Sequence, residues 1–243
     1  MSRALLTMVL AGVMAAPAYA DGVSVAVAAN FTAVAEELAP LFKAETGHDV
    51  IYSFGATGLL YTQITQGAPF EVFLSADDTR PAQAVTEDFG VEGSVFTYAV
   101  GSLALYSTSI DLADGKAVLE AGDFDKVAVA DPTTAPYGRA AQQAIEALGL
   151  TEAITPKLVT GENISQTLQF TESGNAELGF VAASQVIGKA RVWIVPADLY
   201  EPIRQDAVLL KTGQANPAAS AFLDFLQSDA AMAVIEASGY VVE

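Results

Sequence analysis

The chain has 243 residues, of which 52% are hydrophobic, with no cysteine and a formal net charge of −18 at pH 7. Without cysteine it can form neither disulfides nor thiolate metal sites. The excess of 29 acidic over 11 basic side chains argues against nucleic acid and acidic lipid headgroups as partners, because both would repel the protein.

Residues 1–20 have the pattern of a secretory signal peptide. Arg3 supplies a short positive segment, residues 4–15 are almost wholly apolar, and an A-x-A cleavage site ends at Ala20. This apolar stretch is shorter than the roughly 18 residues that a membrane-spanning helix needs, and no later stretch reaches that length. The sequence therefore predicts export, cleavage after Ala20 and a soluble mature chain.

From Asp21 onward the hydrophobic pattern alternates between short strands and amphipathic helices. A buried strand at residues 23–29 leads directly into a helix at residues 33–45, in which Val34 and Leu38 share one face. The same order continues through predicted strands at 49–54 and 70–74 and predicted helices at 59–66 and 81–87. Such a β-α-β order predicts a parallel sheet with helices on both faces.

A second series of the same kind follows a long β-rich run at residues 95–106, which Gly101 interrupts. A strand of this length is too long for one sheet, so it predicts a crossover between two lobes. The remaining predicted strands are 127–130, 157–160, 178–182, 191–195 and 207–211, and the remaining predicted helices are 139–148, 163–171, 217–227 and 230–237.

The sequence thus predicts an α/β fold of two lobes, each a mainly parallel sheet flanked by helices, joined by two strand crossovers. We place lobe 1 at residues 21–101 and 207–243, and lobe 2 at residues 102–206. No low-complexity linker separates the lobes. The cleft between them is therefore the expected ligand site.

The predicted strand-to-helix junctions offer neutral hydrogen-bond donors. Asn30 has an amide side chain and a backbone N–H, and Thr57 has a hydroxyl beside Gly58, which lets a ligand approach the backbone closely. Tyr137 lies in the segment that leads into a later helix, and Ile164 is the first helical residue after the predicted cap Asn163. Donors at helix N-termini can bind a fully deprotonated anion without any Lys or Arg in contact.

Each of these four residues also has an ordinary structural explanation. Asn30 could be a helix cap, Thr57 a turn residue, Tyr137 a packing residue and Ile164 a core residue. A common site is favoured because all four lie at equivalent junctions, two in each predicted lobe. The sequence therefore predicts that they grip one small anion together.

The protonation state of that anion depends on whether an acceptor is near. A protonated oxyanion such as hydrogen phosphate needs an acceptor, normally a carboxylate, and none of the four residues supplies one. Three acids lie close enough in sequence to leave the question open: Asp77, Asp131 and Glu162.

Short motifs of small and polar residues recur at these junctions over the whole mature chain. They are Val27-Ala28-Ala29-Asn30-Phe31, Ser53-Phe54-Gly55-Ala56-Thr57-Gly58, Gly67-Ala68-Pro69, Phe73-Leu74-Ser75-Ala76-Asp77, Val129-Ala130-Asp131-Pro132, Pro136-Tyr137-Gly138, Glu162-Asn163-Ile164 and Leu178-Gly179-Phe180-Val181. Together these motifs resemble those of the periplasmic molybdate-binding proteins that supply ABC importers.

The resemblance implies a two-lobed periplasmic-binding-protein fold of type II and capture of molybdate, and of tungstate, in the interlobe cleft. It implies a periplasmic monomer that binds no nucleic acid, needs neither a cofactor nor a bare metal cation, and delivers the anion to a membrane permease with its cytoplasmic ATPase. The anion contacts that it implies are Asn30, Thr57, Tyr137 and Ile164, with Ala29, Gly58 and Ala182 as further candidates.

The chain departs from this family pattern at three positions. Asn30 stands where many members have serine, and Ala182 stands where some have a tyrosine whose hydroxyl reaches the anion. Tyr137 stands where those same members have a small residue. We therefore hypothesise that the Tyr137 hydroxyl replaces the hydroxyl that is missing at Ala182.

Two other binding functions stay open, and an enzyme is not expected. The alternatives are a protein for another tetrahedral oxyanion, such as sulfate or chromate, and a sensory binding protein that docks on a receptor. His48 is the sole histidine, and there is no Gly-x-Ser-x-Gly turn for a nucleophile and no clustered set of metal ligands. The loop at residues 53–58 lacks the Gly-Lys-Ser/Thr ending of a nucleotide-binding loop.

Overall fold

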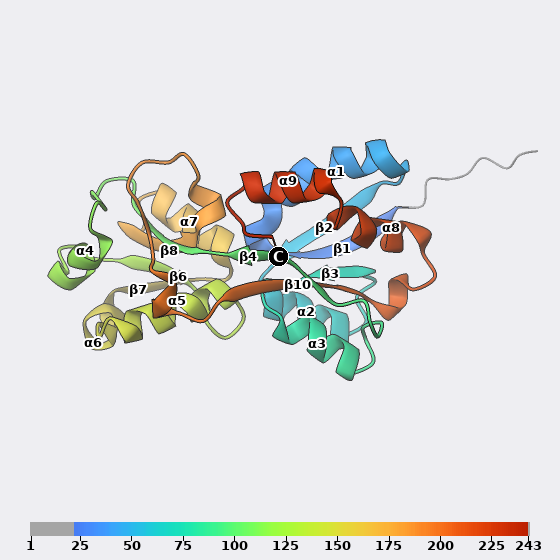
Figure 1. Ribbon diagram of the computed structural model, residues 1–243. Coiled ribbons are helices and arrows are strands. Elements are labelled where there is room, and N and C mark those ends of the chain that lie inside the picture. Colours follow the sequence, from blue (N-terminus) through green and yellow to red (C-terminus); the bar gives the residue numbers. More distant parts are fainter. Residues whose placement is uncertain (1–21, 243) are drawn as a thin grey trace, which may run out of the picture.

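The computed structural model describes residues 22–242 and shows two lobes side by side (Figure 1). The predicted signal peptide and its cleavage site after Ala20 lie outside the described residues. Each lobe is built on a five-stranded sheet. The predicted α/β fold of two lobes is therefore confirmed.

The sheet of lobe 1 has the strand order β2-β1-β3-β10-β4. Strands β2, β1 and β3 are parallel to one another, whereas β10 runs antiparallel to both of its neighbours. The bounds are β1 (Val23–Ala28), β2 (Val50–Gly55), β3 (Val72–Leu74), β4 (Phe96–Gly101) and β10 (Ile203–Leu209). The parallel part places the carboxyl ends of β1 and β2 at the same edge.

The sheet of lobe 2 repeats this plan with the order β7-β6-β8-β5-β9. Strands β7, β6 and β8 are parallel, and β5 runs antiparallel to β8 and β9. The bounds are β5 (Leu103–Tyr106), β6 (Val127–Ala130), β7 (Leu158–Gly161), β8 (Leu178–Ala182) and β9 (Val192–Ile194). By position in the sheet, β6 corresponds to β1 and β7 corresponds to β2.

Helices cover both faces of the lobe 1 sheet, with α1, α8 and α9 on one face and α2 and α3 on the other (Figure 1). The two faces bury separate apolar clusters, one around Phe31 and Phe222 and one around Leu60 and Phe73. In lobe 1 the helices are α1 (Thr32–Thr46), α2 (Thr57–Thr65), α3 (Thr79–Thr86), α8 (Pro217–Leu226) and α9 (Asp229–Ala237).

Lobe 2 has four α-helices among the described residues, two of which the hydrophobic pattern did not predict. The bounds are α4 (Gly115–Ala121), α5 (Pro136–Ala147), α6 (Thr151–Ile154) and α7 (Ile164–Glu172). Helices α4 and α6 were missed because each is too short to show a helical period. Short 3₁₀ turns complete the chain: η1 (Ala29–Phe31), η2 (Thr155–Lys157), η3 (Ala183–Val186), η4 (Ala197–Leu199) and η5 (Lys211–Gly213).

The two lobes are joined where the chain crosses between the sheets. The long β-rich run breaks at Ser102, so that β4 lies in the sheet of lobe 1 and β5 in the sheet of lobe 2. The return differs from the predicted boundary at residue 207, because β10 already pairs with β4 from Ile203. Polar side chains at Gln205 and Asp206 hid the start of this strand, although both are buried.

Candidate functional site

Four chain segments that follow strands meet at a small cavity between the lobes. Its volume is about 10 Å³, which is room for about one water-sized sphere. The lobes are in contact beside it, because the Gly58 N–H donates to the Thr134 carbonyl oxygen at 2.8 Å. The lining residues are Ala28, Ala29, Asn30, Gly55, Ala56, Thr57, Ala76, Ala135, Pro136, Tyr137, Asn163 and Ile164. Among the described residues that line the cavity, none carries a charged side chain.

The cavity brings together the four predicted contact residues, which follow equivalent strands of the two sheets. Asn30 follows the central strand β1 and Thr57 follows the edge strand β2. Tyr137 lies at the start of α5, which comes after β6, and Ile164 lies at the start of α7, which comes after β7. Each lobe therefore contributes a matching pair of junctions to one point.

In lobe 1 the first turns of η1 and α2 leave donors unsatisfied. The backbone N–H groups of Asn30 and Thr57 bond to no described residue, as expected for the first turn of a helix. The Thr57 hydroxyl accepts a hydrogen bond from the Ala76 N–H at 3.1 Å, which leaves its own hydrogen to donate. Since Thr57 is only 1% exposed, that hydrogen has to find its acceptor inside the cavity.

In lobe 2 the side-chain cap of α7 leaves the backbone N–H of Ile164 without a partner. The Asn163 side chain accepts from the backbone N–H groups of Ser165 and Gln166, each at 3.0 Å. The N–H of Ile164, at the first helical position, bonds to no described residue, and the same holds for the N–H of Tyr137 in the first turn of α5. Lobe 2 therefore offers two backbone donors.

The side chain of Asn30 braces the site, and its position could not be read from the sequence. Its amide nitrogen donates to the Gln205 side-chain oxygen at 2.7 Å and to the Tyr240 hydroxyl at 3.0 Å, so both of its hydrogens are used. The Tyr240 hydroxyl in turn donates to the Asn30 carbonyl oxygen at 3.0 Å. Asparagine thus ties this junction to β10 and to the C-terminal segment, which a serine side chain is too short to do.

The hydroxyl of Tyr137 lies at the crossover between the lobes and not in the cavity. It accepts a hydrogen bond from the Gln205 side-chain nitrogen at 3.4 Å, and a Cβ atom at Gly101 would lie only 2.0 Å from it. Burial raises the pKa of this hydroxyl well above its usual range, so it stays protonated. This contact gives the hydroxyl a partner at the crossover, and the hypothesis that it replaces a hydroxyl missing at Ala182 stays a prediction.

Of the three further candidates for anion contact, Ala29, Gly58 and Ala182, only Ala29 lines the cavity. Ala29 lines the cavity, and its carbonyl oxygen accepts hydrogen bonds from the hydroxyls of Thr32 and Ser165. The N–H of Gly58 donates across the lobes to the carbonyl oxygen of Thr134 at 2.8 Å, so it is already used. Ala182 does not line the cavity; its N–H donates to the side chain of Gln185.

The three acids that could accept a proton from a ligand are engaged or turned to solvent. The Asp77 carboxylate accepts from the Ser75 hydroxyl at 3.0 Å and forms an ion pair with Arg80. Asp131 accepts from the hydroxyl and the N–H of Thr133, which lowers the pKa of its carboxyl. Glu162 is exposed. The cavity lining therefore supplies donors without a carboxylate acceptor.

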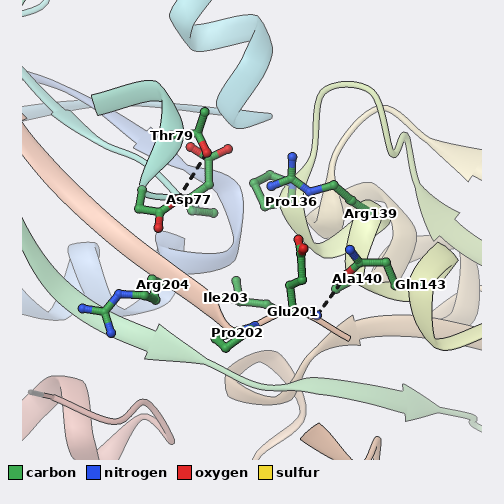
Figure 2. A pocket seen from close by; sticks show the side chains of 12 residues that line it. Asp77, Thr79, Pro136, Arg139, Ala140, Gln143, Glu201, Pro202, Ile203 and Arg204 are labelled. Atoms are coloured by element: carbon green, nitrogen blue, oxygen red, sulfur yellow. Dashed lines mark hydrogen bonds between the residues drawn. The ribbon is translucent and has the colours of Figure 1, made fainter. Parts of the chain in front are cut away.

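A wider cleft of about 370 Å³ adjoins the cavity and shares Ala76 and Pro136 with it (Figure 2). Figure 2 shows Asp77 on one side of this cleft and Arg139 and Glu201 on the other. The charged groups thus lie outside the cavity, whose own walls are neutral.

Residues 22–242 show neither a metal cluster nor a single membrane-spanning helix. No group of three or more His, Asp or Glu side chains there could hold a metal ion. No single helix in that range is long and apolar enough to cross a membrane. The pair α8 and α9, which is bent by 58°, has the necessary length and apolar composition only when the two helices are taken together.

Replacing Asn30 with Ala is expected to lower the free energy of unfolding by about 1–3 kcal/mol, because it removes two buried hydrogen bonds, one to Gln205 and one to Tyr240. Urea unfolding followed by circular dichroism measures this change. The control is Asn175→Ala, which removes an exposed amide that bonds only to Ser173. Equal stability losses in the two variants would contradict a bracing role.

Comparison with known proteins bears on the whole described chain, since residues 23–241 match the family described as bacterial extracellular solute-binding protein. The molybdate-binding protein ModA of Rhodobacter capsulatus is 55% identical over 232 residues, which cover 95% of this chain and 92% of that protein. The ModA of Azotobacter vinelandii is 53% identical over 236 residues, covering 95% of this chain and 94% of that protein.

Solved structures agree with these relatives. The periplasmic molybdate-binding protein of Azotobacter vinelandii superposes with a TM-score of 0.88 at 38% identity, covering 91% of this chain and 99% of that one. A sulfate-binding protein of Mycobacterium tuberculosis, at 14% identity and a TM-score of 0.75, shares the fold alone. The chain belongs to the bacterial extracellular solute-binding protein family, and within it to the group that contains these molybdate-binding relatives.

Proposed function

We propose that this protein captures molybdate, and also tungstate, in its interlobe cavity and delivers it to an ABC importer. The observation that carries the proposal is the set of four neutral junctions, two from each lobe, around one closed cavity. The relatives that are 55% and 53% identical and named molybdate-binding proteins support the choice of anion.

The proposed contacts are all hydrogen-bond donors. They are the backbone N–H groups of Asn30, Thr57, Tyr137 and Ile164 and the hydroxyl of Thr57. A hydrogen bond to a charged group contributes about 1.5–3 kcal/mol, so five of them can outweigh the long-range repulsion from an acidic chain. Salt in the surrounding solution weakens that distant repulsion far more than it weakens close contacts.

Donors without an acceptor favour an anion that carries no proton. Molybdate and tungstate are fully deprotonated tetrahedral dianions near neutral pH, whereas phosphate keeps a proton that would face N–H groups. Sulfate carries the same charge but is smaller, so a rigid cage would hold it with poorly spaced donors. Each hydrogen bond lost in this way weakens binding by about 1–3 kcal/mol.

Binding is proposed to be coupled to closure of the lobes. An anion that contacts Asn30 and Thr57 of lobe 1 and Tyr137 and Ile164 of lobe 2 at once is held fully only in the closed form. It therefore shifts the population toward that form. The crossovers at Ser102 and just before Ile203 would act as the hinge.

The remaining parts of the proposal concern the setting. We propose a periplasmic monomer, released by cleavage after Ala20, that needs no cofactor and passes the anion to a membrane permease with its cytoplasmic ATPase. We also propose that it has no catalytic activity. Its relatives are named as binding proteins, and no catalytic constellation of nucleophile, base and orienting group occurs among the described residues.

Calorimetric titration with molybdate, tungstate, sulfate, phosphate and chromate tests the proposal. We expect one site, with molybdate and tungstate binding at least about 100-fold more tightly than sulfate or phosphate, because a mismatch of two donors has about that effect. Tight binding of sulfate or phosphate together with weak binding of molybdate would overturn the proposal.

Thr57→Val and Tyr137→Phe form a matched pair, since each removes one buried hydroxyl near the cavity. Thr57→Val is expected to weaken molybdate binding about 10-fold or more, because it deletes a donor to the anion. Tyr137→Phe is expected to leave the molybdate-to-tungstate affinity ratio unchanged, because its hydroxyl bonds to Gln205. If Tyr137→Phe changes the molybdate-to-tungstate affinity ratio and Thr57→Val does not, the Tyr137 hydroxyl contacts the anion.

A further inference from the structure

The lobes touch each other directly beside the cavity, through a bond that involves no ligand. The N–H of Gly58, in the first turn of α2, donates to the Thr134 carbonyl oxygen of lobe 2 at 2.8 Å. Gly58 has no side chain, and a Cβ atom there would lie 3.1 Å from the Thr134 Cα and 3.2 Å from its carbonyl oxygen. A side chain at this position would therefore press on the Thr134 backbone, which glycine avoids.

Arg80 makes a second contact to the same segment of lobe 2. One nitrogen of its guanidinium donates to the Thr133 carbonyl oxygen at 3.3 Å, while another pairs with the Asp77 carboxylate. Asp77 is 4% exposed and also accepts from the Arg80 backbone N–H at 3.0 Å, so the guanidinium is held in place before lobe 2 arrives. The planar fork of arginine suits this double contact.

The segment that these groups hold is itself rigid and leads to the cavity. Asp131 accepts from the N–H and the hydroxyl of Thr133 at 2.9 and 2.7 Å, which fixes the turn before α5. Three residues after Thr134 comes Tyr137, whose N–H is one of the proposed donors. On the other side, Gly58 directly follows Thr57. Both contacts therefore lie next to residues that line the cavity without lining it themselves.

We propose that Gly58, Arg80, Thr133 and Thr134 form an interlobe clamp that stabilises the closed form and so slows release of the anion without touching it. The clamp rests on the proposed function for its ligand. Because it acts on closure alone, it strengthens binding of every oxyanion by the same factor. Residues of the cage, by contrast, set which oxyanion is preferred.

The main test is Gly58→Ala. Alanine is favoured over glycine in a helix, and the three atoms nearest to the added methyl group belong to Thr134 of lobe 2 and to the flexible end of the Arg80 side chain. We expect the affinities for molybdate and for tungstate to fall by the same factor, about 10-fold. The change should appear as faster dissociation of the anion. Thermal unfolding without ligand should be unchanged or shifted upward, which separates weaker closure from misfolding.

A second variant tests the arginine without changing the charge beside Asp77. Arg80→Lys keeps the ion pair but cannot span Asp77 and the Thr133 carbonyl with the same fork, and we expect about threefold weaker binding of both anions. The matched control is Arg139→Lys on the wider cleft, which is expected to bind like the unmodified protein. A loss of the same size in Arg139→Lys would show that any arginine near the cleft has this effect.

A third variant keeps the clamp bond and changes only a side chain. The Thr134 hydroxyl is buried and bonds to no described residue, while its carbonyl accepts from Gly58. Thr134→Val keeps that carbonyl and removes the unsatisfied hydroxyl, so binding is expected to be unchanged or tighter. Weaker binding would contradict the proposed role of the backbone.

The clamp and the proposed function can fail separately. If the unmodified protein binds neither molybdate nor tungstate, the proposed function fails. The affinities of the variants are then measured for the oxyanion that the unmodified protein binds most tightly. If it binds molybdate and Gly58→Ala binds equally well, the clamp is wrong and the function stands. A Gly58→Ala protein with an altered molybdate-to-tungstate ratio would also overturn the clamp, because it would make Gly58 part of the cage.

Discussion

The structure depends on backbone N–H groups in the first turns of helices, which have no partner inside the helix. Such groups usually meet water or a capping side chain. Here the N–H groups of Asn30, Thr57, Tyr137 and Ile164 bond to no described residue, and these four residues line one cavity whose side chains are neutral. A buried donor without an acceptor is unfavourable. The proposed anion would supply these donors with an acceptor that has several oxygen atoms.

The two sheets explain why four junctions meet in this way. Strands β1 and β6 are central in their parallel parts and β2 and β7 lie at the edges, so each sheet presents two neighbouring carboxyl ends. When the lobes face each other, the two pairs of ends oppose each other across the cleft. A tetrahedral anion can present one pair of its oxygen atoms to each lobe, which suits donors from two opposing pairs. The chain thus builds one site from two copies of the same plan.

The sequence was sufficient to predict the fold, the crossover near Gly101 and the four junctions, because strand and helix periods and helix starts are local signals. It was not sufficient to predict the direction of side chains. The amide of Asn30 bonds to Gln205 and Tyr240, which are 175 and 210 residues away, and no local pattern shows such partners. The same reason applies to the hydroxyl of Tyr137 and to the N–H of Gly58, whose partners belong to the other lobe or the hinge. The start of β10 was missed because its polar residues are satisfied by equally distant groups.

These distant partners show that several contacts join the lobes, among them the bond from the Ser165 hydroxyl to the Ala29 carbonyl oxygen. Near the crossovers, Gln205 bonds to both Asn30 and Tyr137, and the Ser184 hydroxyl donates to the Tyr240 hydroxyl at 2.9 Å. Beside the cavity, the clamp joins α2 and Arg80 to the turn before α5. An anion bound in the cavity, as proposed, would add bonds of its own to both lobes. Contacts between the lobes contribute equally to the retention of any anion, whereas donor spacing differs in value between anions of different size. Affinity and selectivity can therefore change independently in this fold, since different residues determine them.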